Sequence, residues 1–180
     1  MSGILLPYTR HCFVCGATNP HGLRLRFWAD GNEVRAEFRP DDRHEGYRGI
    51  VHGGVLASAL DEAMFWAAAY VQRRFYVSVQ LDVRFHKKVV VGMRYLVLAR
   101  VVECERRVCH AAAELHGVER EVCVSATGRF FPIRREQVPL QHEDFYPDPR
   151  ALSPRELFRQ GWSCAEAGRR DMISGNGLSR

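Results

Sequence analysis

The sequence contains no long hydrophobic run that is free of charged residues. Its most apolar stretch, residues 54–71, is about long enough to cross a bilayer, but Asp61 and Glu62 interrupt it near the middle. Two adjacent acids at the centre of a spanning helix would cost several kcal/mol to insert. We therefore expect this stretch to be the core helix of a soluble domain, buried on nearly all sides.

The N-terminal region shows no export signal. The apolar residues Ile4, Leu5 and Leu6 stop at Pro7, so they are too few for the hydrophobic part of a signal peptide. We expect a cytoplasmic protein with no membrane partner. In that compartment the six cysteines are expected to be reduced thiols rather than a disulfide framework.

Several motifs of nucleotide, hydrolase and metal chemistry are also absent. The sequence has no glycine-rich phosphate loop and no Gly-x-Ser-x-Gly elbow of a serine hydrolase. Cys12 and Cys15 form one Cys-x-x-Cys pair, with His11 and His21 nearby, but no second pair follows at the spacing of a zinc site. We expect no metal and no cofactor, and we interpret the two cysteines as residues that pack a loop.

Length and charge set broad limits on the architecture and on the partners. With 180 residues, 46% of them hydrophobic, the chain can bury one core, so we expect one domain over 1–132 and a C-terminal strap over 133–180. The net charge of +5 favours an anionic partner. Because no aromatic and basic stripe or recognition motif is present, we expect no nucleic acid among the partners.

The most informative segment places His52, Gly53 and Gly54 at the head of the apolar helix. A glycine pair at a helix start leaves backbone N–H groups accessible, and the helix dipole adds partial positive charge there, which suits an anionic oxygen. Within the helix, Asp61 and Glu62 leave the axis about 100° apart and are not expected to face one pocket. One acid is expected to serve the site and the other a salt bridge or the rim.

The spacing of the glycine and the acid indicates a dimer. Gly53 and Asp61 are separated by about 12 Å of helical rise, too far for both to contact one carbonyl group. If they cooperate, they do so across two copies of the chain. A two-fold dimer with antiparallel helices would bring Gly53 of one protomer near Asp61 of the other.

At these residues the chain resembles the hotdog-fold acyl-CoA thioesterases of the phenylacetyl-CoA thioesterase type. The resemblance rests on His52-Gly53-Gly54 followed by an acid nine residues after the histidine, and it covers roughly residues 10–132. Its other motifs are Cys12-Phe13-Val14-Cys15-Gly16, Asn19-Pro20-His21-Gly22-Leu23, His44-Glu45-Gly46-Tyr47, and Val83-Arg84-Phe85 with Gly92. It implies an α+β hotdog fold with an antiparallel sheet around one long helix, a homodimer or homotetramer, and hydrolysis of an acyl-CoA to a carboxylate and CoA.

Hydrophobic periodicity predicts a compatible order of elements. Strands are expected over 23–29 and 33–38, on either side of the hairpin turn Asp30-Gly31-Asn32. After the helix, the alternation over 76–85 predicts a strand with one apolar and one wet face, and further strands are expected over 93–104, 108–116 and 121–131.

The C-terminal strap is expected to contain one short helix. Ser153-Pro154-Arg155-Glu156 matches an N-cap, a first-turn proline and a capping-box glutamate, so a helix is expected from there to about Gln160. Leu157, Phe158 and Trp162 are available to pack on the body or on a partner protomer. Residues 174–180 are expected to be disordered.

In the reaction that the resemblance implies, the Gly53 N–H stabilises the oxygen of the tetrahedral intermediate. Asp61 either attacks the carbonyl to form a mixed anhydride or activates water, and the sequence leaves both routes open. Glu62 is the second choice for this role. A thiol of pKa about 8.5 leaves as thiolate without a strong general acid.

Other residues are expected to support the site. His52 is expected to orient the glycine loop beside Gly54. Many relatives carry Gln or Asn near position 45, whereas this chain has Glu45, which either points away or acts as a second polar group in altered chemistry. The basic residues expected near the CoA phosphates are Arg84, Lys87 and Lys88, with solvated strand-end charges as the alternative.

Glu45 and the C-terminal extension also support another hypothesis, a non-catalytic hotdog protein that binds an acyl thioester. The identity of the acyl group stays open. The aromatic residues Phe65, Trp66 and Tyr70 of the helix are compatible with an aromatic or medium-length acyl chain, although such residues more often belong to the core.

Overall fold

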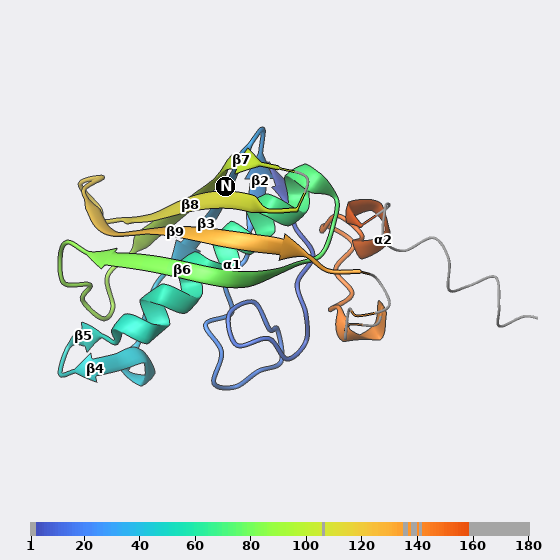
Figure 1. Cartoon of the computed structure of the whole chain (residues 1–180). Coiled ribbons are helices and arrows are strands. Elements are labelled where there is room, and N and C mark those ends of the chain that lie inside the picture. The colour runs from blue at the N-terminus through green and yellow to red at the C-terminus, as the bar shows by residue number, and fades with distance from the viewer. Residues whose placement is uncertain (1–2, 106, 135–136, 138–139, 141, 159–180) are drawn as a thin grey trace, which may run out of the picture.

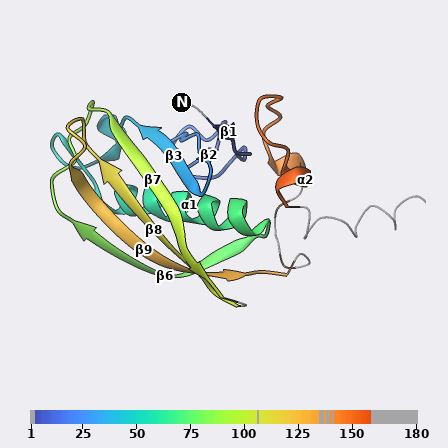
Figure 2. The same ribbon diagram turned by 90° about the horizontal axis from the view of Figure 1, so that it is seen from above.

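The computed structural model describes residues 3–105, 107–134, 137, 140 and 142–158. One long helix, α1 (Gly53–Gln72), lies against an antiparallel sheet. The sheet contains β1 (Ile4–Leu5), β2 (Trp28–Asp30), β3 (Glu33–Phe38), β6 (Tyr76–Phe85), β7 (Tyr95–Cys104), β8 (Cys109–His116) and β9 (Val122–Pro132). Its strand order is β1-β2-β3-β7-β8-β9-β6, and the sheet curves around α1 (Figures 1 and 2). The expected α+β hotdog arrangement is confirmed.

Helix α1 extends the predicted range by one residue at each end. His52 caps its start, and Arg73 ends it in the left-handed region with φ 57°. The face toward the sheet is fully buried and supplies much of the core, through Leu56, Ala59, Leu60, Ala63, Met64, Trp66, Ala67, Ala68 and Ala69. Among the described residues, no helix is both long and apolar enough to cross a membrane.

The strands β3 and β6 match their predicted ranges residue for residue, and β7, β8 and β9 lie within two residues of theirs. The strand expected over 23–29 is much shorter and begins only at Trp28. Arg24 interrupts the extended backbone with a positive φ of 55°, and the Leu25 N–H bonds to the Val14 carbonyl of the N-terminal loop. The alternation in this region nevertheless orients Leu25, Phe27 and Ala29 into the core.

The prediction that only one face of β6 is wet does not hold for the single chain, because the apolar side chains are exposed as well. A bulge lies between Ser78 and Gln80. Among the described strands, β6 is the last of the sheet and pairs with β9 alone. Its apolar side chains remain exposed because no further element of the described chain covers them. They are Val77, Val79, Leu81 and Phe85, which are 44%, 49%, 36% and 56% exposed.

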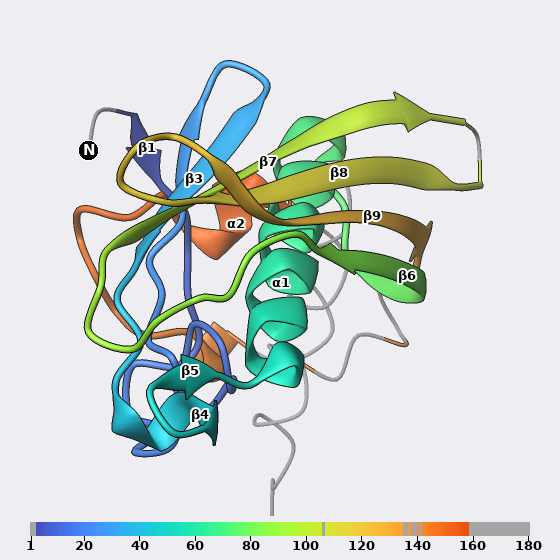
Figure 3. The ribbon, with the colours of Figure 1, turned by 90° about the vertical axis from the view of Figure 1, so that its left-hand side faces the viewer.

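A small hairpin that the sequence did not predict lies beside the start of α1. It consists of β4 (Glu45–Tyr47) and β5 (Ile50–Val51), preceded by a 3-10 helix at Asp42–His44. Figure 3 shows it at the N-terminal end of α1. Strands of two or three residues are too short for a periodicity to show, so the pattern gave no signal here.

The C-terminal segment packs on the body. Its helix α2 (Pro154–Leu157) has the predicted capping box between Ser153 and Glu156 but ends three residues before Gln160. Leu157 and Phe158 are fully buried, and the Phe158 ring stacks on Phe75 with a centroid distance of 3.7 Å. The predictions for Trp162 and for residues 174–180 lie outside the described residues.

One disulfide contradicts the expectation that all cysteines are reduced. Cys104 and Cys109 are bonded where β7 and β8 meet, because the strand register places them opposite each other with Cα atoms 4.0 Å apart. Cys12, Cys15 and Cys123 are free thiols.

Candidate active site

The first turn of α1 offers a free backbone donor. His52 Nδ1 accepts a hydrogen bond from the Gly54 N–H at 2.9 Å, so the histidine ring caps the helix. Within the described part of the chain, the Gly53 N–H donates no hydrogen bond. Because the helix dipole places partial positive charge at this end, the Gly53 N–H is suited to an oxygen that becomes negative.

The β4–β5 hairpin holds the glycine turn in place. A Cβ at Gly46 would lie 3.0 Å from the Cα of His52, so glycine allows the hairpin to approach the cap closely. Glu45 Oε1 accepts a hydrogen bond from the Gly49 N–H at 2.7 Å. The Glu45 carboxylate is thus turned toward its own hairpin, the first of the two alternatives raised by the sequence.

A cavity of about 580 Å³ opens beside Gly53. Lys87 and Lys88 line it together with Phe85, whose ring tip would be 3.2 Å from a Cβ at Gly53. Arg84, the third basic residue expected near CoA, does not line it. The structure therefore brings two of the three predicted basic residues to the helix start.

Asp61 lines a second cavity of about 510 Å³. Ser78 on β6 donates a hydrogen bond to Asp61 Oδ2 at 3.4 Å, whereas Oδ1 is buried and accepts no hydrogen bond from the described residues. Burial raises the pKa of Asp61, and the Ser78 hydrogen bond partly offsets the increase. A buried carboxylate oxygen without a partner is costly, so this oxygen is available to a ligand.

Glu62 lines the same cavity as Asp61, so the prediction that the two acids cannot face one pocket is wrong. The cavity extends from β6, where Ser78 contacts Asp61, to the N-terminal segment, where Cys12 contacts Glu62. It is therefore wide enough for two side chains that leave α1 in different directions. Glu62 Oε1 accepts from Trp66 Nε1 at 3.0 Å and contacts Cys12 Sγ at 3.6 Å. Burial and the charge of Cys12 raise the pKa of Glu62 to about 8.

Cys12 and Cys15 belong to this cavity as well. A hydrogen bond from Cys15, together with backbone N–H groups of Cys15 and Val14, lowers the pKa of Cys12 to about 6. The same pairing and burial raise the pKa of Cys15. The contact between Glu62 and Cys12 was not predictable from the sequence, because the two residues lie fifty positions apart.

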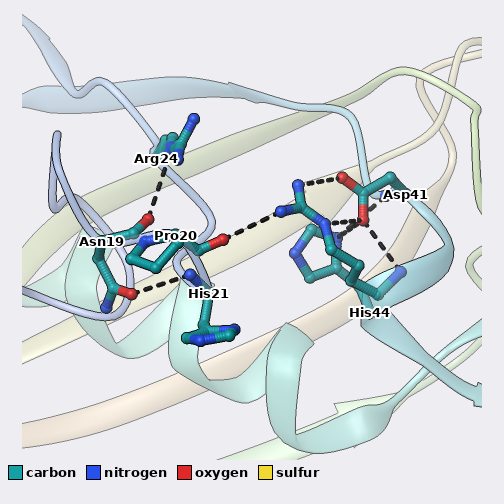
Figure 4. Close-up of polar contacts among 7 residues, drawn as sticks. Asn19, Pro20, His21, Arg24, Asp41 and His44 are labelled. Carbon is teal, nitrogen blue, oxygen red and sulfur yellow. Dashed lines mark hydrogen bonds and ion pairs between the residues drawn. The ribbon is translucent and has the colours of Figure 1, made fainter.

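The N-terminal segment is tied to the turn before β4 (Figure 4). Arg43 donates to the Pro20 carbonyl at 3.0 Å and pairs with Asp41 at 2.6 Å. On the other side, Asn19 accepts from the His21 N–H at 2.9 Å. Through Arg43, the Asn19 to Leu23 motif therefore lies beside the turn that leads into the His44 to Tyr47 motif.

Gly53 and Asp61 lie in different cavities of the same chain. A single protomer thus presents a free backbone N–H at one place and a carboxylate with a buried oxygen at another. Ser78 contacts Asp61, and Phe85 lies beside Gly53. Neither residue was predicted from the sequence to belong to the site. Their positions on a regular strand gave no chemical signal.

Comparisons with known proteins find similarity over the segment that contains α1. Residues 48–124, which include Gly53, Asp61 and Glu62, match the family model described as Thioesterase superfamily. An uncharacterized protein of Schizosaccharomyces pombe is 31% identical over 110 residues, which are 58% of this chain and 62% of that protein.

Solved structures extend the similarity to the fold. RHA08564, a thioesterase superfamily protein, superposes with a TM-score of 0.64 at 25% identity, covering 67% of this chain and 63% of its own. The smu.793 protein of Streptococcus mutans, solved bound to acetyl CoA, has a TM-score of 0.57 at 17% identity. The match covers 61% of this chain and 88% of the smu.793 chain. The chain thus spans less than two thirds of the yeast protein and of RHA08564. Residues 48–124 are thus similar to the thioesterase superfamily, and the chain shares the hotdog fold of these solved structures.

Proposed function

We propose that the protein is an acyl-CoA thioesterase whose active site is shared between two protomers. The observation that carries the proposal is the buried, unpartnered Oδ1 of Asp61 on the long helix of a thioesterase-superfamily domain. A buried carboxylate oxygen without a hydrogen-bond partner is expensive to keep, and catalysis is a common reason for keeping one.

The reaction adds water to a thioester and yields a carboxylic acid and CoA. The Gly53 N–H of one protomer stabilises the carbonyl oxygen as it becomes negative. Asp61 of the partner subunit either removes a proton from the attacking water or attacks the carbonyl carbon itself; the second route gives a mixed anhydride, which water then hydrolyses to release the acid and restore Asp61. The C–S bond then breaks, and the thiolate leaves without a strong general acid because its conjugate thiol has a pKa of about 8.5. CoA is part of the substrate, and this reaction requires no cofactor.

The two cavities provide places for the two ends of the substrate. Lys87 and Lys88 line the cavity beside Gly53 and supply positive charge for the CoA phosphates. The smu.793 protein, which shares the fold, binds acetyl CoA. The cavity beside Asp61 is lined by aromatic side chains that suit an aromatic or medium-length acyl group, namely Phe65, Trp66, Phe75, Tyr76, Phe130 and Phe145.

The test is thiol release from a panel of acyl-CoAs that runs from acetyl through medium-chain to phenylacetyl and long-chain thioesters. We expect release with at least one aromatic or medium-chain substrate and a dependence on Asp61. Binding of the acyl-CoA without release by the wild-type protein would contradict hydrolysis and support the non-catalytic alternative.

The shared site requires a dimer, and β6 is the edge that we expect to form it. The strand has an unpaired edge and exposes Val79 and its apolar neighbours. Replacing Val79 with lysine places like charges opposite each other across a two-fold axis. We expect the Val79→Lys protein to elute as a monomer and to lose hydrolysis in parallel.

The matched control is Val102→Lys. Val102 is 60% exposed on β7, which β8 and β9 separate from β6 in the strand order. Size-exclusion chromatography with light scattering measures both variants. A Val79→Lys protein that remains a fully active dimer would rule out this edge as the interface.

A further inference from the structure

Three potential metal ligands meet at the wall of the Asp61 cavity. The Sγ atoms of Cys12 and Cys15 and a carboxylate oxygen of Glu62 all lie within 4.8 Å of one another. They come from two segments that are far apart in the sequence, the N-terminal loop and α1. We propose that these three residues form a zinc site that fastens the N-terminal loop to the helix.

The distances suit a tetrahedral ion. With Zn–S near 2.3 Å and Zn–O near 2.0 Å, two ligand atoms of a tetrahedral site lie about 3.5 to 3.8 Å apart. Cys12 Sγ and Glu62 Oε1 are 3.6 Å apart. An ion between them therefore requires little movement of the side chains.

The loop is shaped to present both sulfur atoms to one point. The N–H groups of Val14 and Cys15 donate to Cys12 Sγ at 3.2 and 3.4 Å, and the Gly16 N–H closes the turn on the Cys12 carbonyl at 3.0 Å. A Cβ at Gly16 would lie 2.2 Å from that carbonyl oxygen, so only glycine fits. Hydrogen bonds to a sulfur atom and a tight Cys-x-x-Cys-Gly turn orient thiolates for a metal.

The third ligand is oriented in the same way. Trp66 Nε1 donates to Glu62 Oε1 at 3.0 Å from one helical turn further along α1. A hydrogen bond of this kind, to a side chain that binds a metal, holds the carboxylate in the orientation that coordination requires. Because Trp66 is 2% exposed in the core, the position of this donor is fixed by packing.

The donor set selects zinc among the common ions. Two thiolates and one carboxylate match its borderline softness and the Cys-x2-Cys spacing of its sites, whereas iron–sulfur clusters are held by four cysteine ligands in most proteins. All three residues line the cavity, so a water molecule can complete the four ligands. The expectation of no metal was based on the absence of a second pair of ligands in the sequence. In the fold, Glu62 supplies the third ligand, and water can supply the fourth.

The inference is independent of the proposed hydrolysis, because it concerns how the loop is attached and is measured without substrate. The full chain is purified without chelator, dialysed against zinc-free buffer, and analysed for metal by mass spectrometry. We expect about one zinc per protomer in the wild-type protein and in the control Cys123→Ser, which removes a buried free cysteine elsewhere.

The variants Cys12→Ser and Glu62→Gln test the ligands separately. We expect each to weaken zinc binding at least about tenfold in a competition titration with a chromophoric chelator. Circular dichroism establishes that each variant is folded. Wild-type protein that takes up no zinc from micromolar solution, or a folded Glu62→Gln protein with wild-type affinity, would overturn the proposal.

Binding of cobalt provides a readout that does not depend on whether the protein retains zinc during purification. Addition of Co²⁺ to the metal-free protein is expected to give thiolate-to-cobalt charge-transfer absorption and to protect two thiols from a thiol reagent. The Cys123→Ser protein should behave in the same way. Full reactivity of Cys12 in the presence of excess zinc or cobalt would contradict the site.

Discussion

Replacing Asp61 with asparagine is expected to lower kcat for thioester hydrolysis by about 10²- to 10⁴-fold. The amide has the size and shape of the carboxylate, but it is neither a base nor a nucleophile. It would still accept the hydrogen bond from Ser78. The KM of the variant is expected to change little, because the lost interaction acts on the reacting carbonyl or water and not on the CoA.

The same substitution is expected to leave the protein at least as stable as the wild type. Burial disfavours the charged form of Asp61, as the raised pKa shows, and an amide has no charge to bury. The melting temperature and kcat are therefore measured on the same preparation. An activity that falls together with the melting temperature would indicate damage to the fold instead of the loss of a catalytic group.

Two other acids serve as controls for this assignment. Asp82 on β6 is exposed and accepts a hydrogen bond from Gln80, so Asp82→Asn is expected to retain hydrolysis. Glu62, the neighbour in the same cavity, is held by Trp66 and Cys12, and Glu62→Gln is expected to reduce kcat less than Asp61→Asn. The reverse order would transfer the catalytic role to Glu62.

Replacing Gly53 with proline is expected to lower kcat by about 10²- to 10³-fold, because proline removes the N–H that stabilises the oxyanion. The helix tolerates the change. Gly53 is the first residue of α1, where proline is favoured, and His52 already has the extended φ of −64° and ψ of 135° that a residue before proline requires.

The matched control is Gly53→Ala, which adds the same Cβ but keeps the N–H. That Cβ would lie 3.2 Å from the tip of the exposed Phe85 ring, which can shift by a few tenths of an ångström. We expect Gly53→Ala to retain most of the activity that Gly53→Pro loses. Equal losses in the two variants would attribute the effect to the Cβ and would contradict the oxyanion role of this N–H.

Long regular elements were predictable because their patterns are repeated many times. The apolar run over 54–71 and the alternation over 76–85 each contain enough residues to define a period, and the structure places α1 and β6 there. The exposure of the apolar face of β6 was not predictable, because the place of this strand at the end of the strand order depends on which strands pair. Hairpin β4–β5 was missed because two or three residues define no period.

The candidate site was predictable where chemistry and local geometry coincide. A glycine pair at a helix start and an acid inside an apolar helix are visible in the sequence, and the structure gives each a cavity of its own. The contact of Glu62 with Cys12 was not visible, because it arises only when the N-terminal loop folds onto α1. The pairing of Cys104 with Cys109 likewise follows from strand register.

The central claim is that each active site takes Gly53 from one protomer and Asp61 from the other. Complementation of two inactive variants tests it most directly. Differently tagged Asp61→Asn and Gly53→Pro chains are co-expressed, and the mixed dimers are isolated by tandem affinity purification. A mixed dimer contains one site with both changes and one site with neither.

The account predicts that isolated mixed dimers recover about half of the wild-type kcat per dimer, although each parent alone is nearly inactive. The reference is a dimer of two differently tagged wild-type chains, co-expressed and purified in the same way. If the mixed dimers stay as inactive as their parents, Gly53 and Asp61 do not combine across the interface, and the shared active site is contradicted.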